Sequence, residues 1–159
     1  MVRAMTVFAL AAVLAGLPSP GLGQADEEAA VLAVVEAMFN AMRAGDSTAF
    51  RAVLHPTATG ASVSVRDGQP TLARESSLEG FVQAVGTPHE QVWDEKIWDA
   101  EVRIDGLLAT VWTPYAFYLG DQLSHCGVDA FQLFKGEDGW QVFHIADTRR
   151  REGCEVPAD

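Results

Sequence analysis

The chain has 159 residues, a formal net charge of -11 and two cysteines. This length suits one domain with a short appendage, and a composition that is 48% hydrophobic and 21% charged argues against wholesale disorder. The acidic balance argues against a surface that binds nucleic acid or anionic lipid. Two cysteines cannot build a zinc ribbon or a dense disulfide scaffold.

The first 25 residues predict a secretory signal peptide. Their only charge, Arg3, is followed by an apolar run over residues 5–17, then by two prolines and a small-residue cleavage motif that ends at Ala25. The apolar run is shorter than the roughly 20 residues that span a bilayer, which favours cleavage over a retained anchor. We therefore expect a secreted or periplasmic domain over residues 26–151, with a polar tail over 152–159 and no membrane contact after cleavage.

The first half of this domain predicts three helices and a short hairpin. Apolar residues at spacings of three and four predict a helix over residues 29–44, which Gly45 ends. Asp46 or Ser47 then begins a short helix that runs to about Leu54. Alternating residues around an Asp-Gly turn predict the hairpin, and a third helix follows over residues 76–86.

The second half predicts four long strands joined by short turns. They cover residues 91–104, 107–119, 124–135 and 140–149. Such short connections require antiparallel neighbours. The predicted fold class is therefore α+β, with a curved antiparallel sheet of four long strands plus the short hairpin, and with the three helices on one face. The other sheet face is also apolar, which predicts a homodimer through the outer face of the sheet.

Four stretches of the chain carry a resemblance to a known superfamily. They are Ala109–Tyr115, Ser124–Leu133, Gly139-Trp140 and Ile145–Arg150. With the order of predicted elements, they resemble the nuclear transport factor 2-like superfamily, which includes ketosteroid isomerase and SnoaL-like cyclases, and within it the secreted bacterial proteins labelled as lumazine-binding. The resemblance implies a cone with a pocket between sheet and helices, and often a dimer. It implies no single reaction, because this fold carries both enzymes and non-enzymes.

Asp129 is the first candidate for chemistry. It shares a strand face with His125, and its neighbours Val128, Ala130 and Phe131 are apolar. Apolar surroundings raise the pKa of a carboxyl group, which suits a general base. Alternatively, Asp129 pairs with an arginine and only stabilises the sheet.

Asp147 and Arg149 form the second candidate. A three-residue loop between the last two strands would place Gly127 opposite Asp147 and His125 opposite Arg149, so that both candidates lie on one face. Arg149 would then contact a carboxylate or an anionic ligand group. The alternative is a buried ion-pair network that holds the strand ends together.

The remaining candidates concern the pocket wall and the cysteines. Four aromatic residues are expected to line an apolar pocket: Phe39, Trp112, Tyr118 and Phe131. In an oxidising compartment Cys126 and Cys154 most often pair, and the alternative is a nucleophilic Cys126 beside His125. The histidines lack the spacing of a metal site, and we expect no cofactor.

Together these observations predict an exported domain that binds a small, partly apolar molecule and carries no assigned reaction. One alternative is an enzyme of the isomerase, dehydratase, cyclase or epoxide-hydrolase type, with Asp129 or Asp147 as base and His125 and Arg149 in support. The other is a dimeric interaction module that uses the sheet face.

Overall fold

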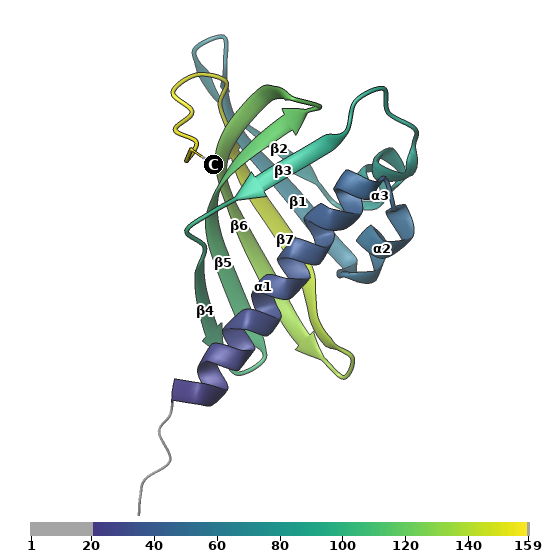
Figure 1. Cartoon of the computed structure of the whole chain (residues 1–159), viewed down its shortest axis with the longest axis vertical. Coiled ribbons are helices and arrows are strands. Elements are labelled where there is room, and N and C mark those ends of the chain that lie inside the picture. The colour runs from purple at the N-terminus through teal and green to yellow at the C-terminus, as the bar shows by residue number, and fades with distance from the viewer. Residues whose placement is uncertain (1–20, 159) are drawn as a thin grey trace, which may run out of the picture.

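The computed structural model describes residues 21–158, which form three helices and one seven-stranded sheet (Figure 1). The elements are α1 (Gly21–Ala44), α2 (Ser47–Ala52), β1 (Leu54–Arg66), β2 (Gln69–Glu75), α3 (Glu79–Gly86), β3 (Trp93–Ile97), β4 (Glu101–Asp105), β5 (Leu108–Leu119), β6 (Gln122–Gly136) and β7 (Gly139–Arg149). The α+β class is confirmed. The predicted signal peptide lies outside the described residues except for positions 21–25, which begin α1.

The three helices lie on one side of the curved sheet, as Figure 1 shows. The long helix α1 buries Val31, Val35, Met38 and Met42 against the sheet, and these residues follow the spacing predicted from the sequence. Gly45, at φ 67°, ends this helix, and the Asp46 carboxylate begins α2 by accepting hydrogen bonds from two backbone amides. No helix within residues 21–158 is long and apolar enough to cross a membrane.

The sheet is mixed, which differs from the antiparallel sheet predicted from the short turns. Its order is β2-β1-β7-β6-β5-β3, with β4 also pairing with β5. All neighbours are antiparallel except β1 and β7, which run parallel, with Ser62 beside Asp147 and Ser64 beside Arg149. Since β1 and β7 are far apart in the sequence, turn signals carry no information about this pair. The parallel pair forms one wall of the cavity described below.

The single strand predicted over residues 91–104 is wrong, because the chain forms two strands there, β3 and β4. Both pair with the same edge of β5 and are separated at Asp99, whose φ is 47°. Pro114 lies opposite this break and has no N–H to donate to the neighbouring strand. The Thr113 hydroxyl donates to the Trp98 carbonyl (2.9 Å) and so replaces part of the interrupted ladder.

The predicted register of the last hairpin is wrong by two residues. Asp129, and not Gly127, lies opposite Asp147. The turn contains two residues between the Gly136–Gly139 pair, and an irregularity follows at Gln132 and Leu133. A shift of two residues preserves the face on which each side chain lies, so Asp129, Asp147 and Arg149 still share one face.

Candidate functional site

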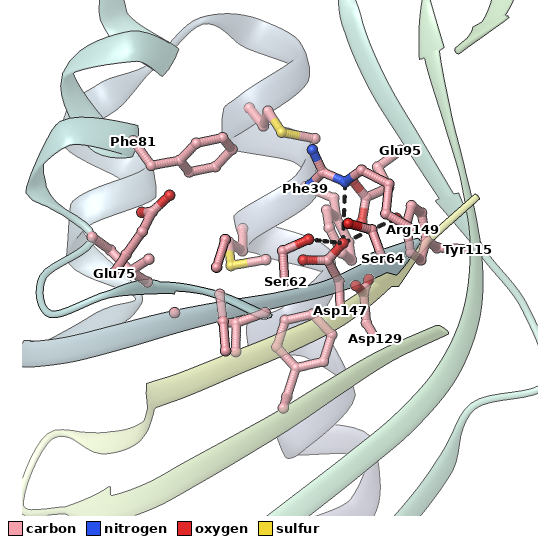
Figure 2. Close-up of a pocket in the computed structure, with 18 of the residues that line it drawn as sticks. Phe39, Ser62, Ser64, Glu75, Phe81, Glu95, Tyr115, Asp129, Asp147 and Arg149 are labelled. Carbon is pink, nitrogen blue, oxygen red and sulfur yellow. Dashed lines mark hydrogen bonds and ion pairs between the residues drawn. The ribbon is translucent and has the colours of Figure 1, made fainter. Parts of the chain in front are cut away.

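A cavity of about 290 Å³ lies between the helices and the concave face of the sheet (Figure 2). Its apolar lining comes from Met38, Phe39 and Met42 of α1 with Phe81 of α3 and Phe131 of β6. One end is polar and is built by strand residues: Ser62, Ser64, Glu95, Tyr115, Asp129, Asp147 and Arg149. In Figure 2, Phe39 lies beside this polar end, whereas Phe81 and Glu75 lie at the other end. The helices therefore supply most of the apolar lining, and the strands supply the polar groups.

Asp147 is the hydrogen-bonding centre of the polar end. Its Oδ2 atom accepts from the Ser62 hydroxyl at 3.1 Å and from Arg149 Nε at 3.2 Å, and it lies 3.3 Å from the Tyr115 hydroxyl. The Tyr115 hydroxyl also lies 3.0 Å from the Thr148 carbonyl oxygen. Three strands thus fix one carboxylate, as the dashed lines of Figure 2 show for the side chains drawn there.

Glu95 and Asp129 form a second carboxyl pair beside this network. Asp129 is 4% exposed, and burial together with the neighbouring Glu95 raises its pKa well above the ordinary value. Burial also raises the pKa of Glu95 to about 7. Two ionised carboxylates only accept hydrogen bonds, so this pair forms a hydrogen bond only when one of them carries a proton. Both pKa values are raised, so the pair holds a proton at pH values where isolated carboxyl groups are ionised.

This pair predicts a pH-dependent stability. The folded state holds protons on Glu95 that the unfolded chain releases between about pH 4.5 and about pH 7, so this stabilisation is lost as the pH rises through about 7. Between pH 5.5 and pH 8, the free energy of unfolding should fall by about 1–3 kcal/mol less in Glu95→Gln than in the wild type, as measured by urea unfolding. Equal slopes for the two proteins would contradict the raised pKa. His125, whose pKa burial lowers to about 4, contributes an opposite slope equally to both proteins.

The structure brings five of the eight predicted catalytic and ligand-binding residues onto the cavity: Phe39, Phe131, Asp129, Asp147 and Arg149. His125 lies behind the Tyr115 ring, at 5.8 Å between ring centroids, and is not part of the cavity wall. Tyr118 lies under the Lys96 ammonium, and Trp112 is 54% exposed on the outer face of the sheet. Neither contributes to the cavity wall.

The residues of the polar end that were not predicted from the sequence are Glu95, Tyr115 and the two serines of β1. A signal for Glu95 was present, because Trp93, Glu95 and Ile97 share one strand face, and an acid between two inward hydrophobic residues is unusual. Tyr115 shares a face with the buried Val111 and Thr113, so its hydroxyl needs an internal partner.

The predicted disulfide is formed between Cys126 and Cys154, with an S–S distance of 2.06 Å. It ties the C-terminal tail to β6, next to the backbone pair between Cys126 and Arg150. A disulfide excludes a free nucleophilic thiol at Cys126, and it is compatible with an extracellular or periplasmic protein.

Comparison with protein families identifies the fold family. Residues 26–144 match the family described as "Putative lumazine-binding". The chain belongs to this family. It is a member of the nuclear transport factor 2-like superfamily, as the resemblance implied, and it is a domain with a ligand-binding pocket. No curated protein sequence matches it significantly.

Solved structures of the same superfamily share the fold. A nuclear transport factor 2-like protein of unknown function from Shewanella baltica is 20% identical, with a TM-score of 0.61 over 80% of this chain and 97% of that one. A protein of unknown function from Mycobacterium tuberculosis is 15% identical, with a TM-score of 0.69 over 87% and 80%. A putative ketosteroid isomerase from Shewanella frigidimarina is 18% identical, with a TM-score of 0.54 over 74% and 94%. At these identities the likeness shows the fold alone.

Proposed function

We propose that this lumazine-binding-like domain binds a small, partly apolar molecule in the cavity. The observation that carries this proposal is the division of the cavity. The side chains of Met38, Phe39 and Phe131 would cover an apolar body, while the groups around Asp147 and Asp129 would contact a polar end. A volume of about 290 Å³ suits a ligand of one or two rings.

The family description supports lumazine as a first probe, because it is a flat molecule of two rings with polar edges. We add 2-naphthol as a second two-ring probe with a single polar group. We expect at least one of them to bind with a Kd below about 1 mM, measured by isothermal titration or ligand-observed NMR.

Filling the polar end of the cavity should abolish this binding. Ser64 of β1 lines the cavity, so the Ser64→Phe ring would occupy the space of the ligand. We expect its affinity for the probe to fall about tenfold or more, by the measurement used for the wild type. Val63→Phe is the matched control, because Val63 is the next residue of the same strand, is 46% exposed and does not line the cavity.

Two outcomes would contradict the proposed binding site. If neither probe binds the wild type, the cavity does not accept ligands of this size and polarity. If Ser64→Phe and Val63→Phe bind the probe as the wild type does, binding occurs elsewhere on the molecule.

An enzyme is the second candidate, and the carboxyl pair is the observation that favours it. A group with a pKa near 7 is well suited to take up and release protons at neutral pH. Glu95, with its pKa raised to about 7, would then act as the base, and protonated Asp129 would act as the acid. This assignment moves the base from Asp129 or Asp147, the residues proposed from the sequence, to Glu95. Turnover of a bound compound, lost in Glu95→Gln, would separate this function from binding alone.

Two further parts of the proposal concern export and assembly. The signal peptide over residues 1–25 is supported by the disulfide, which oxidising compartments favour.

A homodimer through the outer sheet face is supported by Trp112, which is half-exposed there beside a groove that Thr110, Ala130 and Ala146 line. Light scattering should give twice the mass of the chain, and Trp112→Ser should give a monomer.

A further inference from the structure

Hydrogen-bond donors are unevenly distributed at the polar end of the cavity. The Ser62 hydroxyl and Arg149 Nε both donate to Asp147, and the Tyr115 hydroxyl lies between Asp147 and the Thr148 carbonyl. These donors therefore serve one carboxylate and one carbonyl. The Glu95 and Asp129 carboxyls, on β3 and β6, are left facing each other and the cavity.

Asp129 has a side-chain oxygen that receives no hydrogen bond from the described residues. Its Oδ2 atom is buried and meets no hydrogen-bond donor of the described residues, although the residue as a whole is 4% exposed. A buried acceptor without a donor costs about 1–3 kcal/mol. A donor supplied by a ligand would remove this cost, so the polar end favours a ligand group that donates hydrogen bonds over one that only accepts them.

The charges lining the cavity favour a positive donor. The acids are Glu75, Glu95, Asp129 and Asp147, and the bases are Arg66 and Arg149. Arg149 is paired with Asp147, and its charge also lowers the pKa values of Glu95 and Asp129, yet the four acids outnumber the two bases. In Figure 2, Glu75 lies at the opposite end of the cavity from Glu95 and Asp129, so the two acidic groups are separate.

Aromatic rings lie around the same pair. Phe39 and Phe131 contact each other edge to face, with ring centroids 5.9 Å apart, and both line the cavity with Tyr115. Ring faces attract cations, and apolar walls strengthen a charge-assisted hydrogen bond by excluding water. The same walls would cover the apolar body of the ligand.

We propose that the ligand carries a protonated amine, which donates hydrogen bonds to Glu95 and Asp129 while its apolar body packs against Phe39 and Phe131. This inference rests on the proposed binding function and specifies its ligand class. A carboxylate or phosphate ligand is disfavoured, because it would add a negative charge beside the Glu95–Asp129 pair and would bring no donor to Asp129 Oδ2.

The test uses three probes with the same ring and different charges: 2-phenylethylamine, 2-phenylethanol and phenylacetate. Isothermal titration at neutral pH should give an affinity about tenfold higher for the amine than for the alcohol, and the weakest affinity for phenylacetate. If the alcohol or phenylacetate binds the wild type as well as the amine does, the inference is overturned while the proposed binding function stands. The same holds if none of the three binds but lumazine or 2-naphthol does. If no probe of either set binds, both proposals fail.

Substitutions test which carboxyl groups cause the preference for the amine over the alcohol. Glu95→Gln should reduce the advantage of the amine over the alcohol to about threefold or less, and Asp129→Asn should reduce it in the same direction. Glu75→Gln is the matched control, because it removes an acid from the other end of the same cavity and should leave the ratio within about twofold of the wild type. An unchanged ratio in both Glu95→Gln and Asp129→Asn, with thermal unfolding showing folded protein, would overturn the inference.

Discussion

Gly127→Ala is expected to lower the free energy of unfolding by about 3 kcal/mol or more, which is the upper range for overpacking a core. A Cβ atom at this position would lie 1.7 Å from the Thr148 carbonyl oxygen and 2.8 Å from Cε1 of the Tyr115 ring. The nearer atom belongs to the backbone of β7, so relief requires the two strands to separate. Urea unfolding measures the loss.

The control for this substitution is Gly80→Ala in α3. A Cβ atom there meets nothing within 4 Å, and alanine favours a helix over glycine by about 1 kcal/mol. This variant should therefore be as stable as the wild type or slightly more stable. Gly127→Ala with a stability within about 0.5 kcal/mol of the wild type would contradict the close approach of β6 and β7.

Loss of the disulfide has the second-largest expected effect. The bond joins residues 28 positions apart, and closing a loop of this size stabilises the folded state by roughly 3–4 kcal/mol in the chain-entropy model. Cys154→Ala is the preferred variant, because Cys154 is partly exposed whereas Cys126 is buried. Urea unfolding should show a loss of roughly that size.

Reduction of the wild-type protein provides the matched experiment. A thiol reductant should lower the stability of the wild type to that of Cys154→Ala and should leave the variant unchanged. If the reductant has no effect on the wild type, then no disulfide contributes to its stability. Both measurements use the full chain, so they show how much the tethering of the tail to β6 contributes to stability.

The sequence predicted the elements that depend on local signals. The periodicity of α1, the glycine that ends it and the Asp46 cap are all confirmed. The antiparallel neighbours from β5 to β7 and the disulfide are also confirmed. Each of these follows from residues close in the chain or from the chemistry of two cysteines. The limits of the domain over residues 26–151, and the cleavage that would define its start, stay predictions.

Features that depend on distant residues were not predictable. Pro114 divides β3 from β4 although it belongs to β5, so the run of residues 91–104 contains no sign of the break. The parallel pairing of β1 with β7 joins two segments that share no turn. The slip in the β6–β7 register came from a loop one residue shorter than assumed and from an irregularity within the strands.

In the candidate site too, local sequence signals predicted some residues, whereas others depend on contacts between distant segments. Asp129, Asp147 and Arg149 could be grouped because they alternate on two strands joined by a short loop. Trp112 and Tyr118 were assigned to the pocket because of their size, yet strand alternation does not tell which of two apolar faces points inward. Glu95 belongs to the edge strand β3, and only the fold brings it beside Asp129.

The parallel pair of β1 and β7 sets the order in which the cavity can form. Ser62 and Ser64 leave the ribosome long before Asp147 and Arg149, their neighbours across the pair. Contacts between such distant segments form late in folding, because the long stretch of chain between them must be ordered first. The β1–β2 hairpin therefore has no sheet to join until the last strand is made, and the ligand site cannot exist on a growing chain.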